Sequence, residues 1–203
     1  SPNLWEGGEL VTSVEQTDEE NSQRLAAVAG LKQRWELNEN WSFDFGVDRS
    51  QTIKQTSKAP PPLTVTTVFS SPGNDDFTSV TFGSKFRKDA WDWATRVEFK
   101  NADTSDRVNL VSDVIRNLDE GQTLLAKLDV QSNESDDSDS LDAGIQLGYA
   151  YRPDTSRWTI FNRLDLNHAN NQSLGFDTTT QKIVNNLNAN YVLSDETQIA
   201  FQY

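Results

Sequence analysis

Residues 141–152 read LDAGIQLGYAYR, and their side chains alternate in character along the whole stretch. The odd-numbered positions carry Leu, Ala, Ile, Leu, Tyr and Tyr, whereas the even-numbered positions carry Asp, Gly, Gln, Gly, Ala and Arg. Successive side chains of a β-strand point to opposite faces of a sheet. The stretch therefore predicts a strand with one apolar face and one small or charged face.

The same alternation recurs along the chain as five successive hairpins, each joined by a short polar turn. The paired runs are 24–37 with 41–53, 77–87 with 91–100, 107–118 with 122–132, 141–152 with 157–168, and 181–193 with 197–203. We expect residues 4–14 to form a preceding strand, which gives about eleven visible strands. The connections between hairpins are predicted to be long, acidic loops, at about 15–22, 54–76, 101–106, 133–140 and 169–180. The short run 63–69 lies between proline-rich segments and is expected to belong to a loop.

Alternation alone is equally compatible with a soluble sandwich, whose apolar faces meet in a core. Strand length favours a membrane instead. Several runs have more than ten residues, whereas strands of globular proteins usually have about five or six, and a tilted membrane-spanning strand needs about nine to eleven. This difference is the first argument for a transmembrane barrel.

The tryptophans provide the second argument, because they lie near the short turns. Amphipathic aromatic rings prefer the boundary between bilayer and water, and transmembrane barrels carry girdles of them. The predicted membrane-interface aromatics are Trp5, Trp35, Trp41, Trp91, Trp93, Tyr149, Tyr151, Trp158 and Tyr191. We therefore predict an all-β fold, a transmembrane antiparallel up-and-down β-barrel of about twelve strands or more.

Topology follows from the turn lengths. In bacterial outer-membrane barrels the short turns face the periplasm and the long loops face outward. The last run, 197–203, would start at an inner turn and run outward over only about seven residues, whereas such barrels usually end at the periplasmic side. We therefore expect residues 1–203 to be a single outer-membrane barrel domain that is incomplete at its C-terminus.

Composition narrows the functional classes. The chain has a net charge of -13, which argues against nucleic acid as a partner because phosphate binding needs clustered Lys and Arg. It has no cysteine, so neither disulfides nor thiolate metal sites are possible. Its mean hydropathy is -0.67, but averaging dilutes the signal of a barrel whose strands face lipid with alternate residues. The sequence indicates no cofactor.

The charged side chains of the strands share one parity, which predicts that they face the lumen of the barrel. They are Lys32, Arg34, Asp44, Asp48, Lys85, Arg87, Asp92, Arg96, Glu98, Lys100, Lys127, Asp129, Arg152, Arg157, Arg163 and Asp165. Because both signs are present, a mutually satisfied ion-pair network that fills the lumen is one interpretation. A water-filled pore whose charges select solutes is the other.

Residues 133–142 carry Asp136, Asp137, Asp139 and Asp142, a weak candidate for calcium or magnesium because carboxylate oxygens suit both ions. The segment lacks the glycine and the distal glutamate of an EF-hand loop, so no specific metal site is predicted. Divalent ions could instead bridge these carboxylates to lipopolysaccharide phosphates. The expected partners are thus the lipid bilayer and lipopolysaccharide, together with other subunits or domains of a larger envelope assembly.

The stretch 147–153, LGYAYRP, followed by DTSRW at 154–158 and NRL at 162–164, resembles a hairpin that recurs in outer-membrane barrel regions at the ends of large surface proteins of Gram-negative bacteria. The stretch FGVDRSQT at 45–52 is similar to another hairpin limb of those regions. Together these matches cover about a sixth of the chain. The resemblance implies a barrel located in the bacterial outer membrane, and it supplies no catalytic motif.

Three functional classes follow. The preferred one is an outer-membrane barrel that acts as a membrane anchor or a porin-like channel, without enzymatic activity. The alternative is a soluble or secreted all-β module that binds a ligand through its loops. A distant third is an outer-membrane hydrolase that uses His168, the only histidine, with Ser173 nearby in the sequence and Asp165 or Asn167 as an orienting group. No nucleophile-elbow motif surrounds Ser173.

Overall fold

The computed structural model describes residues 3–19, 22–57, 76–194 and 196–203, which form a single antiparallel sheet. Its strands are β1 (Asn3–Trp5), β2 (Gly8–Glu19), β3 (Ser22–Glu36), β4 (Trp41–Ser57), β5 (Phe77–Lys88), β6 (Trp91–Ala102), β7 (Ser105–Asp119), β8 (Gln122–Ser135), β9 (Ser138–Tyr151), β10 (Trp158–Ser173), β11 (Phe176–Ser194) and β12 (Thr197–Gln202). The strand order in the sheet equals the order in the chain. The all-β, up-and-down architecture predicted from the alternation is therefore confirmed.

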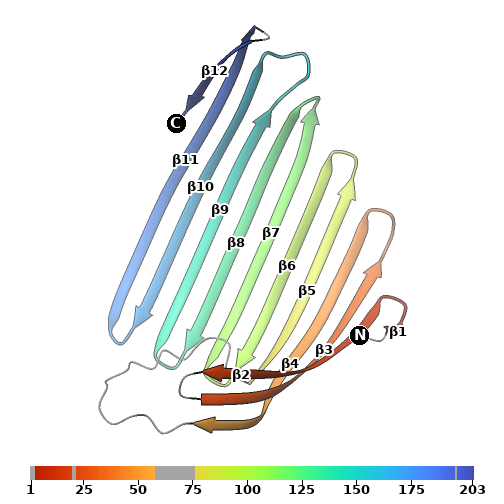
Figure 1. The fold of residues 1–203 in the computed structure, drawn as a ribbon, viewed down its shortest axis with the longest axis vertical. Helices are drawn as coiled ribbons and strands as arrows, with labels where there is room; N and C mark the ends of the chain where they lie inside the picture. The colour runs from red at the N-terminus through yellow and green to blue at the C-terminus, as the bar shows by residue number, and fades with distance from the viewer. Residues whose placement is uncertain (1–2, 20–21, 58–75, 195) are drawn as a thin grey trace.

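The sheet is open in the described residues, because no pairing joins β12 to β1. These two strands lie at opposite edges of the sheet (Figure 1). Closure into a barrel is thus not part of the observed architecture.

Most connections opposite the short turns are shorter than predicted. Only two residues separate β2 from β3, β6 from β7, β8 from β9, and β10 from β11. The strands run on through the predicted acidic loops, and in the last of these turns Leu174 and Gly175 both have positive φ, at 47° and 84°. Two residues with positive φ match the twist of the flanking strands in a hairpin. The prediction of long loops was wrong at these four places, and the expected loop at 63–69 lies outside the described residues.

The predicted first strand, 4–14, is divided by a turn. Gly7 has φ 74°, and its carbonyl accepts a hydrogen bond from the backbone N–H of Arg34 at 2.8 Å. Glycine reaches this conformation without the steric cost that other residues would meet. Trp5 therefore belongs to the short strand β1, and the described sheet has one strand more than predicted.

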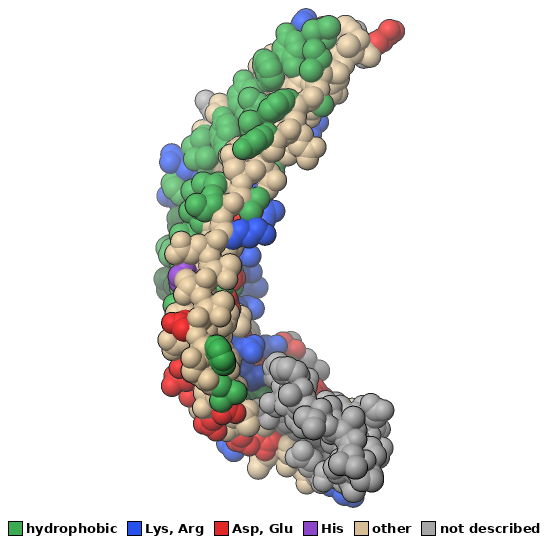
Figure 2. Space-filling model, turned by 90° about the vertical axis from the view of Figure 1, so that its left-hand side faces the viewer, with side chains coloured by type: hydrophobic (Ala, Val, Ile, Leu, Met, Phe, Trp, Pro, Cys, Tyr) green, Lys and Arg blue, Asp and Glu red, His purple; other side chains and the backbone are tan. Residues whose placement is uncertain are grey.

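The sheet is strongly curved, and its two faces differ in chemistry. Viewed along the sheet, it forms a crescent with hydrophobic side chains on the convex side and Lys and Arg on the concave side (Figure 2). Register explains this separation, because pairing is regular over long stretches and residues of one parity remain on one face across neighbouring strands.

Glycines inside the strands all lie on the concave face. They are Gly30, Gly46, Gly83, Gly144 and Gly148. Side chains converge on the inside of a curved sheet, and a residue without a side chain relieves that crowding. Glycine inside a strand often marks a bend or a close approach of neighbouring groups. Their one-sided placement therefore agrees with the direction of curvature.

The described part of the chain has almost no hydrophobic core. Ala26, at 3% exposure, is its one buried apolar side chain, and none of the large side chains is fully buried. A soluble domain normally buries an apolar face against a second layer. The convex face of this sheet has no such layer among the described residues.

Candidate functional site

The convex face carries a continuous apolar band across the sheet. On β6 it runs from Trp91 to Phe99 at alternate positions, and on β9 it runs from Leu141 to Tyr151. Trp91 is 42% exposed and Leu147, near the middle of the β9 segment, is 44% exposed. The band is therefore a surface of the molecule, of a size that monomeric soluble proteins rarely expose.

The short-turn edge of the sheet is staggered in a regular way. From the β3–β4 hairpin onward, each hairpin begins two residues farther along the register than the one before it. The first residue of β4, Trp41, is aligned through Phe86 with Trp93, which is the third residue of β6. The later strands repeat this offset: Trp91 is aligned with Leu124 through Arg116, Gln122 with Ile160 through Tyr151, and Trp158 with Ile199 through Tyr191. The stagger thus amounts to one residue per strand.

This stagger corresponds to a definite strand tilt. The stagger is one residue, about 3.3 Å along the strand, and neighbouring strands are about 4.8 Å apart. With these two lengths, the turns lie at one level when the strands tilt by about 35°. That tilt is within the range of about 35–45° found in transmembrane barrels. With the same tilt, the apolar segments of β6 and β9 are about 22 and 27 Å high, close to the apolar band of about 25 Å in such barrels.

The predicted interface aromatics follow this staggered edge on the convex face. Trp35 lies opposite Phe43, Tyr149 shares a row with Trp91 through Arg116 and Leu124, and Trp158 lies opposite Tyr191. Several rings contact one another, and the centroids of Trp158 and Tyr191 are 4.8 Å apart. The side chain of Trp5 lies outside the described residues. The others form one belt along the short turns.

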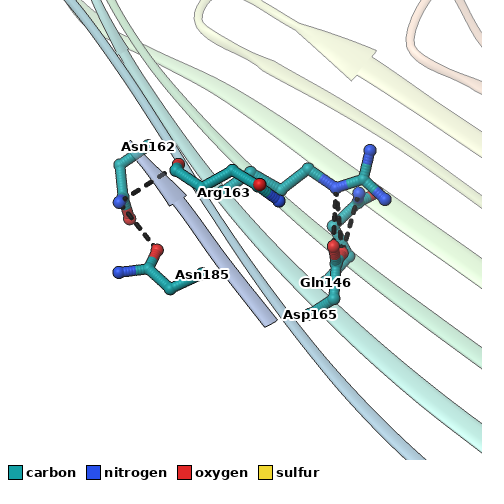
Figure 3. A network of polar contacts seen from close by, with 6 residues as sticks. Gln146, Asn162, Arg163, Asp165 and Asn185 are labelled. Atoms are coloured by element: carbon teal, nitrogen blue, oxygen red, sulfur yellow. Dashed lines mark hydrogen bonds and ion pairs between the residues drawn. The ribbon is translucent and has the colours of Figure 1, made fainter. Parts of the chain in front are cut away.

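Polar side chains within the apolar band bind one another. Trp93 Nε1 donates to Ser112 Oγ at 3.1 Å, and the hydroxyls of Ser112 and Thr95 are 2.7 Å apart. Asn162 Nδ2 donates to Asn185 Oδ1 at 2.8 Å (Figure 3). An unpaired polar group in an apolar environment costs several kcal/mol, so this pairing suits a face that is removed from water.

The pair Asn162–Asn185 provides a test. We expect Asn162→Leu and Asn185→Leu each to leave the other amide without its partner, whereas the double variant removes both polar groups. A double-mutant cycle of the free energy of unfolding in phospholipid vesicles should give a coupling of about 0.6–1.7 kcal/mol. Additive effects of the two substitutions would contradict a role for this hydrogen bond.

The predicted inward-facing charges within the strands share the concave face, as the register requires. Some form ion pairs across or along strands. Arg96 Nη2 lies 3.3 Å from Asp44 Oδ2, Arg87 Nη2 lies 2.6 Å from Asp92 Oδ2, and Arg163 Nε lies 2.9 Å from Asp165 Oδ2. Gln146 adds a hydrogen bond of 3.1 Å to Asp165 (Figure 3). Most of these side chains are well exposed, so each pair contributes little to stability.

Gly83 permits one of these pairs to form. It lies between Asp44 and Arg96 in the register, on the strand that separates them. The carboxylate of Asp44 occupies the position that a side chain at Gly83 would need. Arg96 and Asp44 can therefore meet across the intervening strand. They line a hollow of about 680 Å³ on the concave face together with Lys32, Lys85 and Glu98.

The weak metal candidate is not assembled. Asp136 and Asp137 form the turn between β8 and β9, and the alternation of β9 then places Asp139 and Asp142 on opposite faces. Among the described residues, no group of three or more His, Asp or Glu side chains is arranged to hold a metal ion. The segment is a tight hairpin and not a loop that could wrap an ion, so the structure does not bring these four carboxylates together.

His168 lies inside β10, not at its end, because the strand continues to Ser173. Its side chain is on the convex face, opposite Ala143 and Gln181, whereas Asp165, Asn167 and Ser173 have the other parity and lie on the concave face. The structure therefore does not bring His168 together with the groups that the hydrolase hypothesis requires.

No protein-family model matches the sequence, and no curated protein is significantly similar to it. Among the described residues, no helix is long and apolar enough to cross a membrane.

Proposed function

We propose that this chain forms the wall of a β-barrel in the outer membrane of a Gram-negative bacterium, where it acts as a membrane anchor or a porin-like channel. One observation carries the proposal. A large apolar band, bounded by an aromatic belt, is exposed on the convex face of a sheet without a core. In a bilayer this face contacts lipid, and the concave face borders the lumen.

Energetics favour lipid over water at the convex face. Burying one large apolar side chain contributes about 1.5–3 kcal/mol. Many such side chains are exposed here, among them Phe82, Phe99, Ile145, Leu147 and Phe201. A soluble ligand-binding module would need a second layer over this face, and the described residues provide none. Lipid acyl chains supply that contact without a further protein layer.

The concave face favours a polar lumen. It bears charges of both signs, and they line a hollow whose volume is about 680 Å³. A channel requires that water occupies this space, whereas an anchor requires only that the ion pairs are satisfied. In either case the short turns face the periplasm, and the acidic turn at 136–137 faces outward, where divalent ions link its carboxylates to lipopolysaccharide phosphates.

The membrane assignment has a direct test. We expect the purified chain to require detergent for a monodisperse state and to float with phospholipid vesicles in a density gradient. Tryptophan fluorescence should be quenched most strongly by lipids brominated near the headgroup, because the tryptophans form a belt at one boundary. A chain that is monodisperse without detergent and remains at the bottom of the gradient would overturn the proposal.

Single-channel recording separates the two modes. A channel should give discrete conductance steps after insertion into a planar bilayer, and Arg96→Gln should change ion selectivity because Arg96 lines the hollow. Silence across many verified insertions would leave the anchor as the function. Flotation serves as the control, since both modes require insertion.

A further inference from the structure

An apolar groove of about 460 Å³ lies on the convex face, immediately below the aromatic belt. Two neighbouring rows of side chains form it. The lower row runs across four strands through Val114, Ala126, Leu147 and Leu164. Ala126 is the smallest of these side chains, so the surface is hollowed between Val114 and Leu147.

The upper row contains a cationic side chain, Arg116, at the end of the groove. It begins with Trp91 on β6, continues with Arg116 on β7, and reaches Leu124 and Tyr149. The guanidinium of Arg116 lies over the ring of Trp91, with the Cζ atom 4.6 Å from the ring centroid. Among the described residues, no carboxylate is paired with Arg116. The guanidinium of Arg116 thus makes a cation–π contact with Trp91 at the edge of an apolar surface.

A second cation stands on the other side of the same tryptophan. Lys88 on β5 lies directly opposite Trp91 and has the same parity, so Lys88, Trp91 and Arg116 occupy adjacent positions on three strands. Among the strand side chains that the structure describes, these two are the charges of the convex face at the level of the belt, and both are positive. At the opposite edge the convex face carries Asp106, Asp139 and Asp177, together with Arg49.

We propose that this site binds one anionic glycerophospholipid of the leaflet at the short turns. One acyl chain lies in the groove over Ala126, and the headgroup phosphate binds Arg116 and Lys88. A phosphate offers several acceptor oxygens to a guanidinium, and such charge-assisted bonds are the strong ones. The long stems of both cations lie along the apolar face while their charged ends reach the headgroup level. The inference rests on the membrane location proposed above.

Native mass spectrometry of the full chain, released from detergent micelles, tests the site. The probes are dioleoyl phosphatidylglycerol and dioleoyl phosphatidylcholine, which share acyl chains and differ in net charge. We expect retained phosphatidylglycerol adducts at concentrations where phosphatidylcholine is lost. Arg116→Gln should weaken phosphatidylglycerol binding about tenfold, the loss expected for one charged hydrogen bond. Ala126→Phe should fill the groove and weaken the binding of both lipids.

Arg49→Gln is the matched control, because it removes one positive charge from the same face at the opposite edge of the band. It should leave phosphatidylglycerol binding unchanged. Equal losses in Arg116→Gln and Arg49→Gln, or equal affinity for the two lipids in the unmodified chain, would overturn the site. Flotation of each variant with vesicles separates the two proposals, since a chain that floats but has no lipid preference contradicts only the lipid site.

Discussion

Replacing Leu147 with arginine should lower the free energy of unfolding in phospholipid vesicles by about 2–4 kcal/mol, which is the cost of an arginine at the lipid-facing midplane of a barrel. Leu147 lies in the apolar band of β9, flanked by Ala126 and Leu164 in the register, and is 44% exposed. If water covered this face, an exposed arginine would cost almost nothing. The size of the effect therefore reports what surrounds the convex face.

The neighbouring residue is the control for this substitution. Gln146 has the opposite parity, and its amide already donates to Asp165 at 3.1 Å. Gln146→Arg keeps a donor beside that carboxylate, so we expect a change within about 0.5 kcal/mol. Equilibrium urea unfolding of both variants in vesicles, with folded fraction followed by electrophoretic mobility, measures the difference. Equal effects at positions 146 and 147 would contradict a lipid-facing convex surface.

Gly121→Ala should be a strongly damaging turn substitution, at about 2–5 kcal/mol. Gly121 has φ 71°, and its carbonyl accepts a hydrogen bond of 2.6 Å from the backbone N–H of Arg152. A methyl group at this position would overlap the backbone of Arg152 and Pro153, which belongs to the next hairpin. The substitution thus combines a left-handed conformation with a clash that neither backbone can avoid.

Gly175→Ala isolates the conformational part of this cost. Gly175 also has a positive φ in a two-residue turn, but a methyl group there would have no neighbour within 4 Å. We expect a loss of about 1–2 kcal/mol, from the left-handed conformation alone. Urea midpoints for the two variants in detergent micelles give the comparison. If both variants lost the same stability, the contact between Gly121 and the next hairpin would have no energetic role.

Strand positions at the short turns could be predicted from sequence because two signals coincide there. At Trp41 and Trp91, for example, a polar turn is followed at once by alternating aromatic residues, and β4 and β6 begin at these residues. The opposite ends were predicted too short. Residues 169–173 and 176–180 are Asn, Gln, Ser and Thr for the most part, and such composition is typical of loops. In the structure they continue the ladders of β10 and β11 beyond the apolar band.

The face of each side chain could be predicted because parity fixes it. A shift of one residue would move every side chain of a strand to the other face, so a strong pattern leaves one choice. The relation between hairpins was not accessible from the pattern. The hydrogen bond between Asn162 and Asn185 depends on the register between strands. So does the ion pair that Arg96 forms with Asp44 across Gly83. Closeness in sequence suggests that His168 and Ser173 could act together. They are five residues apart in one strand, and an odd separation places their side chains on opposite faces.

The identity of strand order and chain order also bears on how the sheet is assembled. Every pairing joins strands that follow one another in the sequence, so each hairpin closes only a short stretch of chain and the entropic cost of closure remains small. Low contact order favours rapid formation, and the sheet can grow by adding one hairpin at a time to an existing edge. The connection that contains residues 58–75 is the exception, since it joins β4 to β5 through the longest link between paired strands. Pairing of β4 with β5 is therefore the step at which we expect assembly to be slowest.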